Sequence, residues 1–173
     1  MAAVSAVFSA CGRYRYRLDR VIGGPGPVVA FLLHNPSTAD AHDDDATLRR
    51  GIGFARNWGS ARLIYVNAWA AVATRPQDLW AMADPVGPGN DAHIAQAVRE
   101  VAAGGGFVVA AWGVVRPPTE QRVAAKGRLG AVHDRIRVLG CELRALGRNK
   151  DGSPRHPLYV RAGALPEPWS FTP

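Results

Sequence analysis

Four runs of mostly apolar residues, separated by polar and glycine-rich segments, predict four strands, and the first three are interpreted as buried. The runs are VVAFLLH at 28–34, ARLIYVNAWA at 61–70, FVVAAWG at 107–113 and CELRALG at 141–147. Continuous apolar runs of this length are typical of strands covered on both faces, as in a parallel sheet. The alternation of Arg with Tyr and Leu in GRYRYRLDR at 12–20 predicts instead an edge strand with one solvent-exposed face.

Helical patterns lie between these runs. Residues 47–58 place Leu48, Ile52 and Ala55 on one face. A helix capped by Asn90 or Asp91 ends at about residue 103, before three glycines, and the segment 119–140 is mostly helical. A short helix is expected at 76–82, in the loop after the second strand.

Strands that alternate with helices at this spacing require crossover connections, and therefore a mainly parallel sheet. The pattern predicts an α/β fold of three layers (α/β/α), with a four-stranded, mainly parallel central sheet and an N-terminal edge strand or hairpin added to it. Residues 1–173 are interpreted as a single domain.

Polar residues stand where these strands end. Asn35 follows the first run in HNPS, Asn67 lies in IYVNAWAAV, and His156 follows the basic turn GRNKDGSPRHP. The third run ends in Trp112-Gly113. Ligands of open α/β sheets bind beyond the carboxyl ends of the strands. We therefore predict that Asn35, Asn67 and His156 converge on one crevice.

Each of these residues also has a purely structural interpretation. Asn35 before a proline is typical of an Asx-turn. Asn67 can be a hydrogen-bonded core amide, although a buried amide needs several partners. His156 can be an ordinary loop histidine, and Trp80, Trp112 and Trp169 can simply pack in the core or a lid.

An acidic run follows the first strand and leaves three interpretations open. Its members are Asp40, His42, Asp43, Asp44 and Asp45. Asp44 or Asp45 can cap the helix that begins near Thr47, where negative charge is favoured by the helix dipole. Asp43 or Asp44 can instead bind a ribose or an amino group of a base. A metal cluster is the third interpretation, although consecutive side chains point in different directions.

The charge of the chain suggests its partner. The 173 residues carry 21 Lys and Arg against 14 Asp and Glu, a net charge of +7. A basic domain is suited to a polyanion, and we expect DNA or a nucleotide as the partner. Arg148, Lys150 and Arg155, beside the His-Pro pair, are candidate phosphate contacts. Arg13, Arg15 and Arg17 are interpreted as a solvated strand face, or otherwise as a phosphate track.

Other classes are disfavoured by composition. No apolar run approaches the ~20 residues of a membrane span, and the N-terminus lacks the basic segment of a signal peptide. We therefore expect a cytoplasmic protein without membrane attachment. Cys11 and Cys141 are far apart and are interpreted as reduced packing residues, so no metal and no cofactor are expected.

The pattern NPSTAD…RRGIGFARNWG…VNAWA…DPVGPGND…AAWG…HPLY closely resembles a bacterial family described as a domain of unknown function. More distantly, the order of motifs resembles the uracil-DNA glycosylase superfamily. LHNPS is similar to its first motif (Gly-Gln-Asp-Pro-Tyr in one branch), IYVNAWAAV to its next strand, AAWG to the end of the following strand, and RHPLY to its His-Pro loop.

This second resemblance implies a uracil-DNA glycosylase-like fold and N-glycosidase activity on a base. It places Asn35 where the superfamily positions water, Asn67 as the amide that reads the base, and His156 as the catalytic histidine. Two departures alter the motifs: Ser37 stands for Tyr or Gly, and Leu158 stands for the Ser after His-Pro.

These lines of reasoning define the expected site. Asn35, His156 and Asp43 are the candidate catalytic residues. The candidate substrate-binding residues are Ser37, Asp44, Phe54, Asn67 and Trp69, with Phe54, Trp58 or Trp69 stacking on a base flipped out of its helix. The alternatives are a non-catalytic nucleic-acid-binding module and a metal-dependent hydrolase that uses the run Asp43–Asp45. A monomer is expected.

Overall fold

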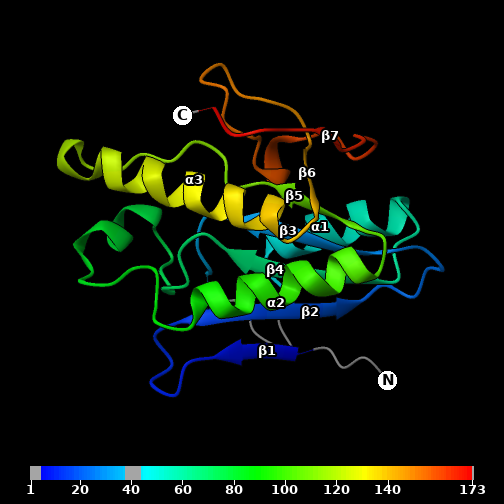
Figure 1. The fold of residues 1–173 in the computed structure, drawn as a ribbon, viewed down its shortest axis with the longest axis horizontal. Coiled ribbons are helices and arrows are strands. Elements are labelled where there is room, and N and C mark those ends of the chain that lie inside the picture. The colour runs from blue at the N-terminus through cyan, green and yellow to red at the C-terminus, as the bar shows by residue number, and fades with distance from the viewer. Residues whose placement is uncertain (1–4, 38–43, 173) are drawn as a thin grey trace.

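The sheet of the computed structural model, which describes residues 5–37 and 44–172, has seven strands in the order β1-β2-β4-β3-β5-β6-β7 (Figure 1). Its four central strands are parallel: β4 (Arg62–Asn67), β3 (Val28–Leu33), β5 (Phe107–Ala110) and β6 (Glu142–Ala145). They coincide with the four apolar runs, so the mixed α/β class with a parallel core is confirmed. Their carboxyl ends lie at one edge of the sheet.

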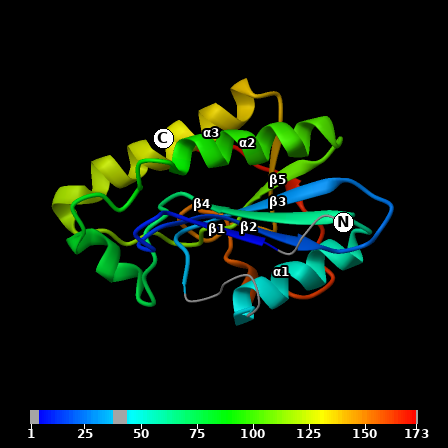
Figure 2. The same cartoon turned by 90° about the horizontal axis from the view of Figure 1, so that it is seen from below.

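Helices cover both faces of this sheet (Figure 2). Helix α1 (Ala46–Asn57) lies on one face, and α2 (Asn90–Ala103) and α3 (Arg122–Val138) lie on the other. Alternate residues of β4 join two separate cores: Tyr65 packs with Phe54 of α1, while Ile64 packs with the α2 and α3 side. This double coverage explains why the parallel strands have continuous apolar sequences. The described part of the chain contains no helix with the length and apolarity needed to cross a membrane.

Antiparallel strands extend the sheet at both edges. β1 (Ser5–Phe8) and β2 (Arg15–Val21) form a hairpin, and β2 pairs with β4. The short β7 (Glu167–Pro168) pairs with β6 at the other edge. The edge position at the N-terminal side therefore belongs to β1, and β2 is an interior strand.

The prediction that Arg15 and Arg17 lie on a solvated strand face is wrong. Both are buried, at 2% and 7% exposed. Arg17 lies between Asp19 and Glu100 of α2, with nitrogen–oxygen distances of 2.7–2.8 Å. Hydrogen bonds from Arg17, with help from Arg62, lower the pKa of Glu100 to about 2. A buried cation is tolerated here because carboxylates on a neighbouring strand position and on a helix satisfy its donors.

Three short 3₁₀ helices complete the loops at the carboxyl edge. They are η1 (Pro76–Ala81), η2 (Thr119–Gln121) and η3 (Pro157–Tyr159). η1 follows β4, η2 leads into α3, and η3 follows the loop after β6. These loops and the N-terminus of α1 surround the ends of the parallel strands, where a ligand site is expected.

Candidate functional site

A cavity of about 770 Å³ opens at the carboxyl ends of the parallel strands. Segments that follow β3, β4, β5 and β6 all contribute to its wall, together with the first turn of α1. The lining includes Arg15, Leu33, His34, Asn35, Ser37, Asp45, Trp80, Trp112, Arg116, Asn149 and His156. The structure thus brings Asn35 and His156 to the wall of one cavity.

Asn35 connects the end of β3 to the loop after β4. Its Nδ2 donates to the carbonyls of Pro36 and Ala73 at 3.0 and 2.9 Å. Its Oδ1 lies 2.9 Å from Nδ1 of His34, which must be the donor in this pair. One lone pair of Oδ1 remains for a ligand or a water, and the amide is held in a single orientation.

His34 is held neutral beneath this loop. Burial lowers its pKa below the ordinary value, whereas the hydrogen bond with Asn35 acts in the opposite direction. Because Nδ1 carries the proton that Asn35 accepts, Nε2 is an acceptor, and it is buried without a hydrogen-bond partner among the described residues. Trp69 and Trp80 flank its ring at centroid distances of 4.8 and 5.9 Å.

His156 is also held in the neutral form. Its Nδ1 accepts a hydrogen bond from the backbone N–H of Leu158 at 3.4 Å, so Nε2 carries the proton. Burial lowers its pKa, and the carboxylate of Asp45 acts in the opposite direction. The cavity therefore contains a neutral imidazole donor with a negative charge nearby.

Asp45 caps α1 and lines the cavity at the same time. Its Oδ1 accepts from the backbone N–H of Leu48 at 2.8 Å, which confirms the predicted cap. Its Oδ2 accepts from the hydroxyl of Ser37, which also lines the cavity. The sequence assigned Asp45 to the helix cap or to a metal cluster, and Asp45 was not among the expected catalytic or substrate-binding residues. The sequence could have indicated this position, because the helix after the first parallel strand begins at the carboxyl end of the sheet, where ligands bind.

Asn67 lies behind the cavity wall and does not line it. It is 1% exposed, and neither Oδ1 nor Nδ2 has a hydrogen-bond partner among the described residues. Strand alternation places its side chain on the α1 side, like that of Tyr65, and it pairs across the sheet with Leu33. Leu33 lines the cavity, so Asn67 is the neighbour across the sheet of a cavity-lining residue.

A β-bulge in the N-terminal hairpin brings Arg15 to the cavity. Val7 pairs with Arg17 and the next residue, Phe8, pairs with Arg15, so Tyr16 is the extra residue. Arg15 thereby faces the α1 side, where its charge acts on Tyr65 and its side chain lines the cavity. Tyr16 packs on the opposite side, stacked on His93 of α2 at 4.9 Å.

Several predicted substrate-binding residues lie away from this cavity. Phe54 and Trp69 are 1% and 2% exposed and belong to the cores on the two sides of the sheet. Asp44 forms an ion pair with Arg20 at 2.7 Å. Asp43 lies outside the described residues. The aromatic rings that do line the cavity include Trp80 and Trp112, which the sequence had assigned to packing.

The candidate phosphate contacts lie on the turn that precedes His156. Arg148, Lys150 and Arg155 are exposed, and Arg155 donates to the carbonyl of Arg148 at 3.2 Å. None of the three lines the cavity, although Asn149 of the same turn does.

The family model described as Protein of unknown function (DUF1643) matches residues 15–158. The chain belongs to the DUF1643 family. The close resemblance to a family described as a domain of unknown function is thereby confirmed. No curated protein and no solved structure matches the chain. The matched segment contains Asn35, Asp45 and His156, and it begins at the cavity-lining Arg15.

The acidic run of this DUF1643 protein is only partly described. Asp44 and Asp45 are engaged by Arg20 and by the N-terminus of α1. In the described ranges, no group of three or more His, Cys, Asp or Glu residues is arranged to hold a metal ion. Asp40, His42 and Asp43 lie outside those ranges.

Gly113 sets the position of His156 in this DUF1643 site. Its φ is +73°, and a Cβ there would come within 3.2 Å of the Cβ of His156. We expect Gly113→Ala to destabilise the protein by about 1–2 kcal/mol, because of left-handed strain and displacement of the His156 loop. Urea unfolding measures this effect. The control, Gly127→Ala on an open helical position, should stabilise by about 0.5–1 kcal/mol. If both substitutions changed the free energy of unfolding equally, the close contact between Gly113 and His156 would be contradicted.

Proposed function

We propose that this protein is a nucleobase N-glycosidase of the uracil-DNA glycosylase type. Its substrate is an uracil-like, modified or mismatched base in DNA or in a nucleotide. The observation that carries the proposal is the meeting of Asn35 and a neutral His156, from loops far apart in the sequence, at one cavity that Asp45 also lines. We also propose that the fold shares the three-layer arrangement of that superfamily by common ancestry.

The cavity groups suit the charges of this reaction. Cleavage of the C1′–N bond leaves negative charge on the base and positive charge on the sugar. Nε2–H of His156 donates to the base oxygen on which negative charge develops. The carboxylate of Asp45 opposes the positive charge on the sugar. Oδ1 of Asn35 holds the water whose oxygen bonds to C1′, and the proton that this water loses passes to solvent or to Asp45.

Asn67 fits the role of base reader in this proposal. Its amide offers one acceptor and one donor face, which match the Watson–Crick edge of a uracil-like base. An amide buried without partners is costly, and a base that enters past Leu33 would supply both missing hydrogen bonds. The base would then be recognised from the floor of the cavity.

Mass spectrometry of released bases tests the proposal. The protein is incubated with oligonucleotides and nucleotides that carry uracil, other modified bases or mismatches. We expect release of at least one base, unchanged in EDTA, and its loss in Asn35→Ala. The control is Asn57→Ala, which removes an amide at an exposed helix position. Loss of the activity in EDTA would favour a metal-dependent hydrolase.

Binding without catalysis is the second candidate function. It is favoured by the Asn35 amide, whose two donors and one lone pair are already used within the protein. In this case no base is released from any member of the panel, yet the oligonucleotides bind. Asn35→Ala would then alter affinity alone.

A further inference from the structure

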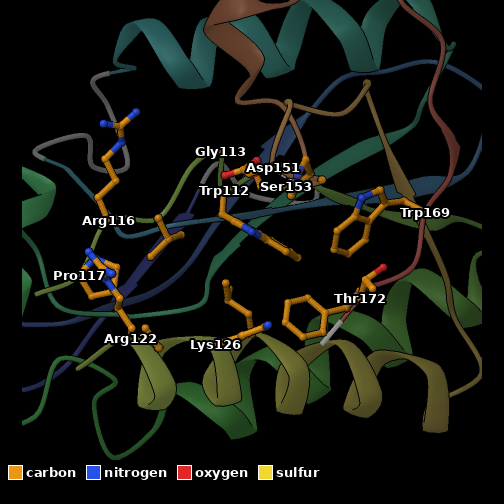
Figure 3. Close-up of a pocket in the computed structure, with 16 residues that line it drawn as sticks. Trp112, Gly113, Arg116, Pro117, Arg122, Lys126, Asp151, Ser153, Trp169 and Thr172 are labelled. Carbon is orange, nitrogen blue, oxygen red and sulfur yellow. Dashed lines mark hydrogen bonds between the residues drawn. The ribbon is translucent and has the colours of Figure 1, made fainter. Parts of the chain in front are cut away.

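A second cavity, of about 710 Å³, adjoins the first (Figure 3). The two share Trp112, Gly113 and Arg116, so the segment that leaves β5 forms the wall between them. Its remaining wall comes from the start of α3, the turn 151–154 and the C-terminal segment 169–172. No role for this cavity follows from the N-glycosidase chemistry at His156.

The floor of the second cavity is aromatic. Trp112 and Trp169 meet edge to face with ring centroids 5.1 Å apart, and Phe171 lies 6.4 Å from Trp169. Trp169 is 6% exposed, and its Nε1 is buried without an acceptor among the described residues. Aromatic surfaces of this kind accept the flat face of a nucleobase, whichever base it is. The unpartnered indole N–H can donate to an acceptor on that base.

Cations surround the mouth of this cavity. They are Arg116, Arg122 and Lys126. Arg122 and Lys126 lie one turn apart at the start of α3, while the Arg116 side chain points away from the aromatic rings (Figure 3). α3 has no side-chain cap and no acidic residue in its first turn. Positive side chains are disfavoured at this end of a helix, because the helix dipole is positive there.

These cations are available to a ligand. The three side chains form no hydrogen bond and no ion pair with another residue of the described ranges. The one carboxylate in the wall, Asp151, accepts from the hydroxyl and the N–H of Ser153 at 2.6 and 3.0 Å. Those bonds, and to a lesser degree the charge of Arg116, lower its pKa. An anion at the start of α3 would therefore relieve repulsion.

We propose that the second cavity binds the nucleotide next to the one whose base enters the first cavity. The adjacent base packs against the aromatic cluster of Trp112, Trp169 and Phe171, and the connecting phosphate is bound by Arg116, Arg122 and Lys126. This inference rests on the proposed function and specifies its substrate as a strand of at least two nucleotides. A free nucleotide leaves the second cavity empty.

Calorimetric titration with undamaged ligands tests this. The probes are thymidine 5′-monophosphate and the 5′-phosphorylated thymidine dinucleotide, at one low salt concentration. We expect the wild type to bind the dinucleotide at least about tenfold more tightly. The double variant R122E/K126E should lose that advantage. Phe171→Ala, which removes part of the stacking surface, should reduce the advantage as well.

A charge-matched control separates a site from a general field. R99E/R137E makes the same change in net charge at two exposed helix positions that lie outside both cavities. It should keep the dinucleotide advantage. An equal loss in both double variants, or no advantage in the wild type, overturns the inference.

The base-release assay distinguishes this inference from the proposed function. If no base is released but R122E/K126E alone loses the dinucleotide advantage, the N-glycosidase proposal fails and the second cavity stands. If bases are released equally fast from mononucleotides and dinucleotides, and the double variant is as active as wild type, the second cavity is not a nucleotide site.

Discussion

His156→Ala is expected to lower the rate of base release by about 10²–10⁴-fold, the range for loss of a positioned proton donor. The side chain lines the cavity, and its Nδ1 is committed to the N–H of Leu158, so Nε2–H is the donor that disappears. Single-turnover release of base, followed by chromatography, measures the effect. The control is His93→Ala, which removes another histidine of lowered pKa, on α2 and outside the cavity.

The pH profile adds a second check on His156. Burial lowers its pKa below the ordinary value of 6.5, so the neutral form predominates at neutral pH. Protonation of Nδ1 at lower pH would remove the acceptor of Leu158 and displace the loop. We expect the rate of base release to fall only below pH 6.5. In His156→Ala, the dependence of this rate on pH in the acid range should change. If His93→Ala slowed base release as much as His156→Ala, the assignment of His156 as the donor would be contradicted.

Gly106→Ala is expected to destabilise the fold by about 3 kcal/mol or more. Gly106 precedes β5, and an ideal Cβ there would lie 1.8 Å from the carbonyl oxygen of Val28, at the start of β3. Backbone atoms cannot rotate away as a flexible side chain can. The ends of two central parallel strands must therefore separate. Urea unfolding of the purified variant, or its absence from the soluble fraction, measures the loss.

The neighbouring glycine is the matched control. Gly105 has φ +64°, but its Cβ would meet nothing within 4 Å. Gly105→Ala should cost only the left-handed strain of one residue, about 1–2 kcal/mol. If the two substitutions cost the same free energy of unfolding, the close approach of Gly106 to Val28 is incorrect.

Local sequence patterns determined the parallel core and part of the site. A strand buried on both faces needs apolar residues at every position, which is why VVAFLL could be identified without knowing its neighbours. The cap by Asp45 was equally local, since an aspartate before a helix satisfies an N–H three residues on. Asn35 and His156 could be placed at one cavity because the carboxyl ends of parallel strands share an edge.

Tertiary contacts decided what these patterns left open. Alternating Arg and Tyr indicated a wet strand face, but β1 pairs outside β2, and Glu100 on α2 supplies the buried counter-charge for Arg17. The bulge at Tyr16 turned Arg15 to the cavity, and the alternation of Arg with Tyr does not by itself mark a bulge. Trp69 and Trp112 are both buried in the core, but only Trp112 also lines the cavity.

The sequence by itself determined which segments form the parallel core strands and at which end of the sheet their polar ends meet. The tertiary structure decided which side chains point into the cavity, which charges are neutralised and that Asn67 lies behind the wall. The physical reason is the separation along the chain of the residues that interact. Burial and capping depend on residues a few positions apart, whereas side-chain direction and charge pairing depend on strands and helices that meet only after folding.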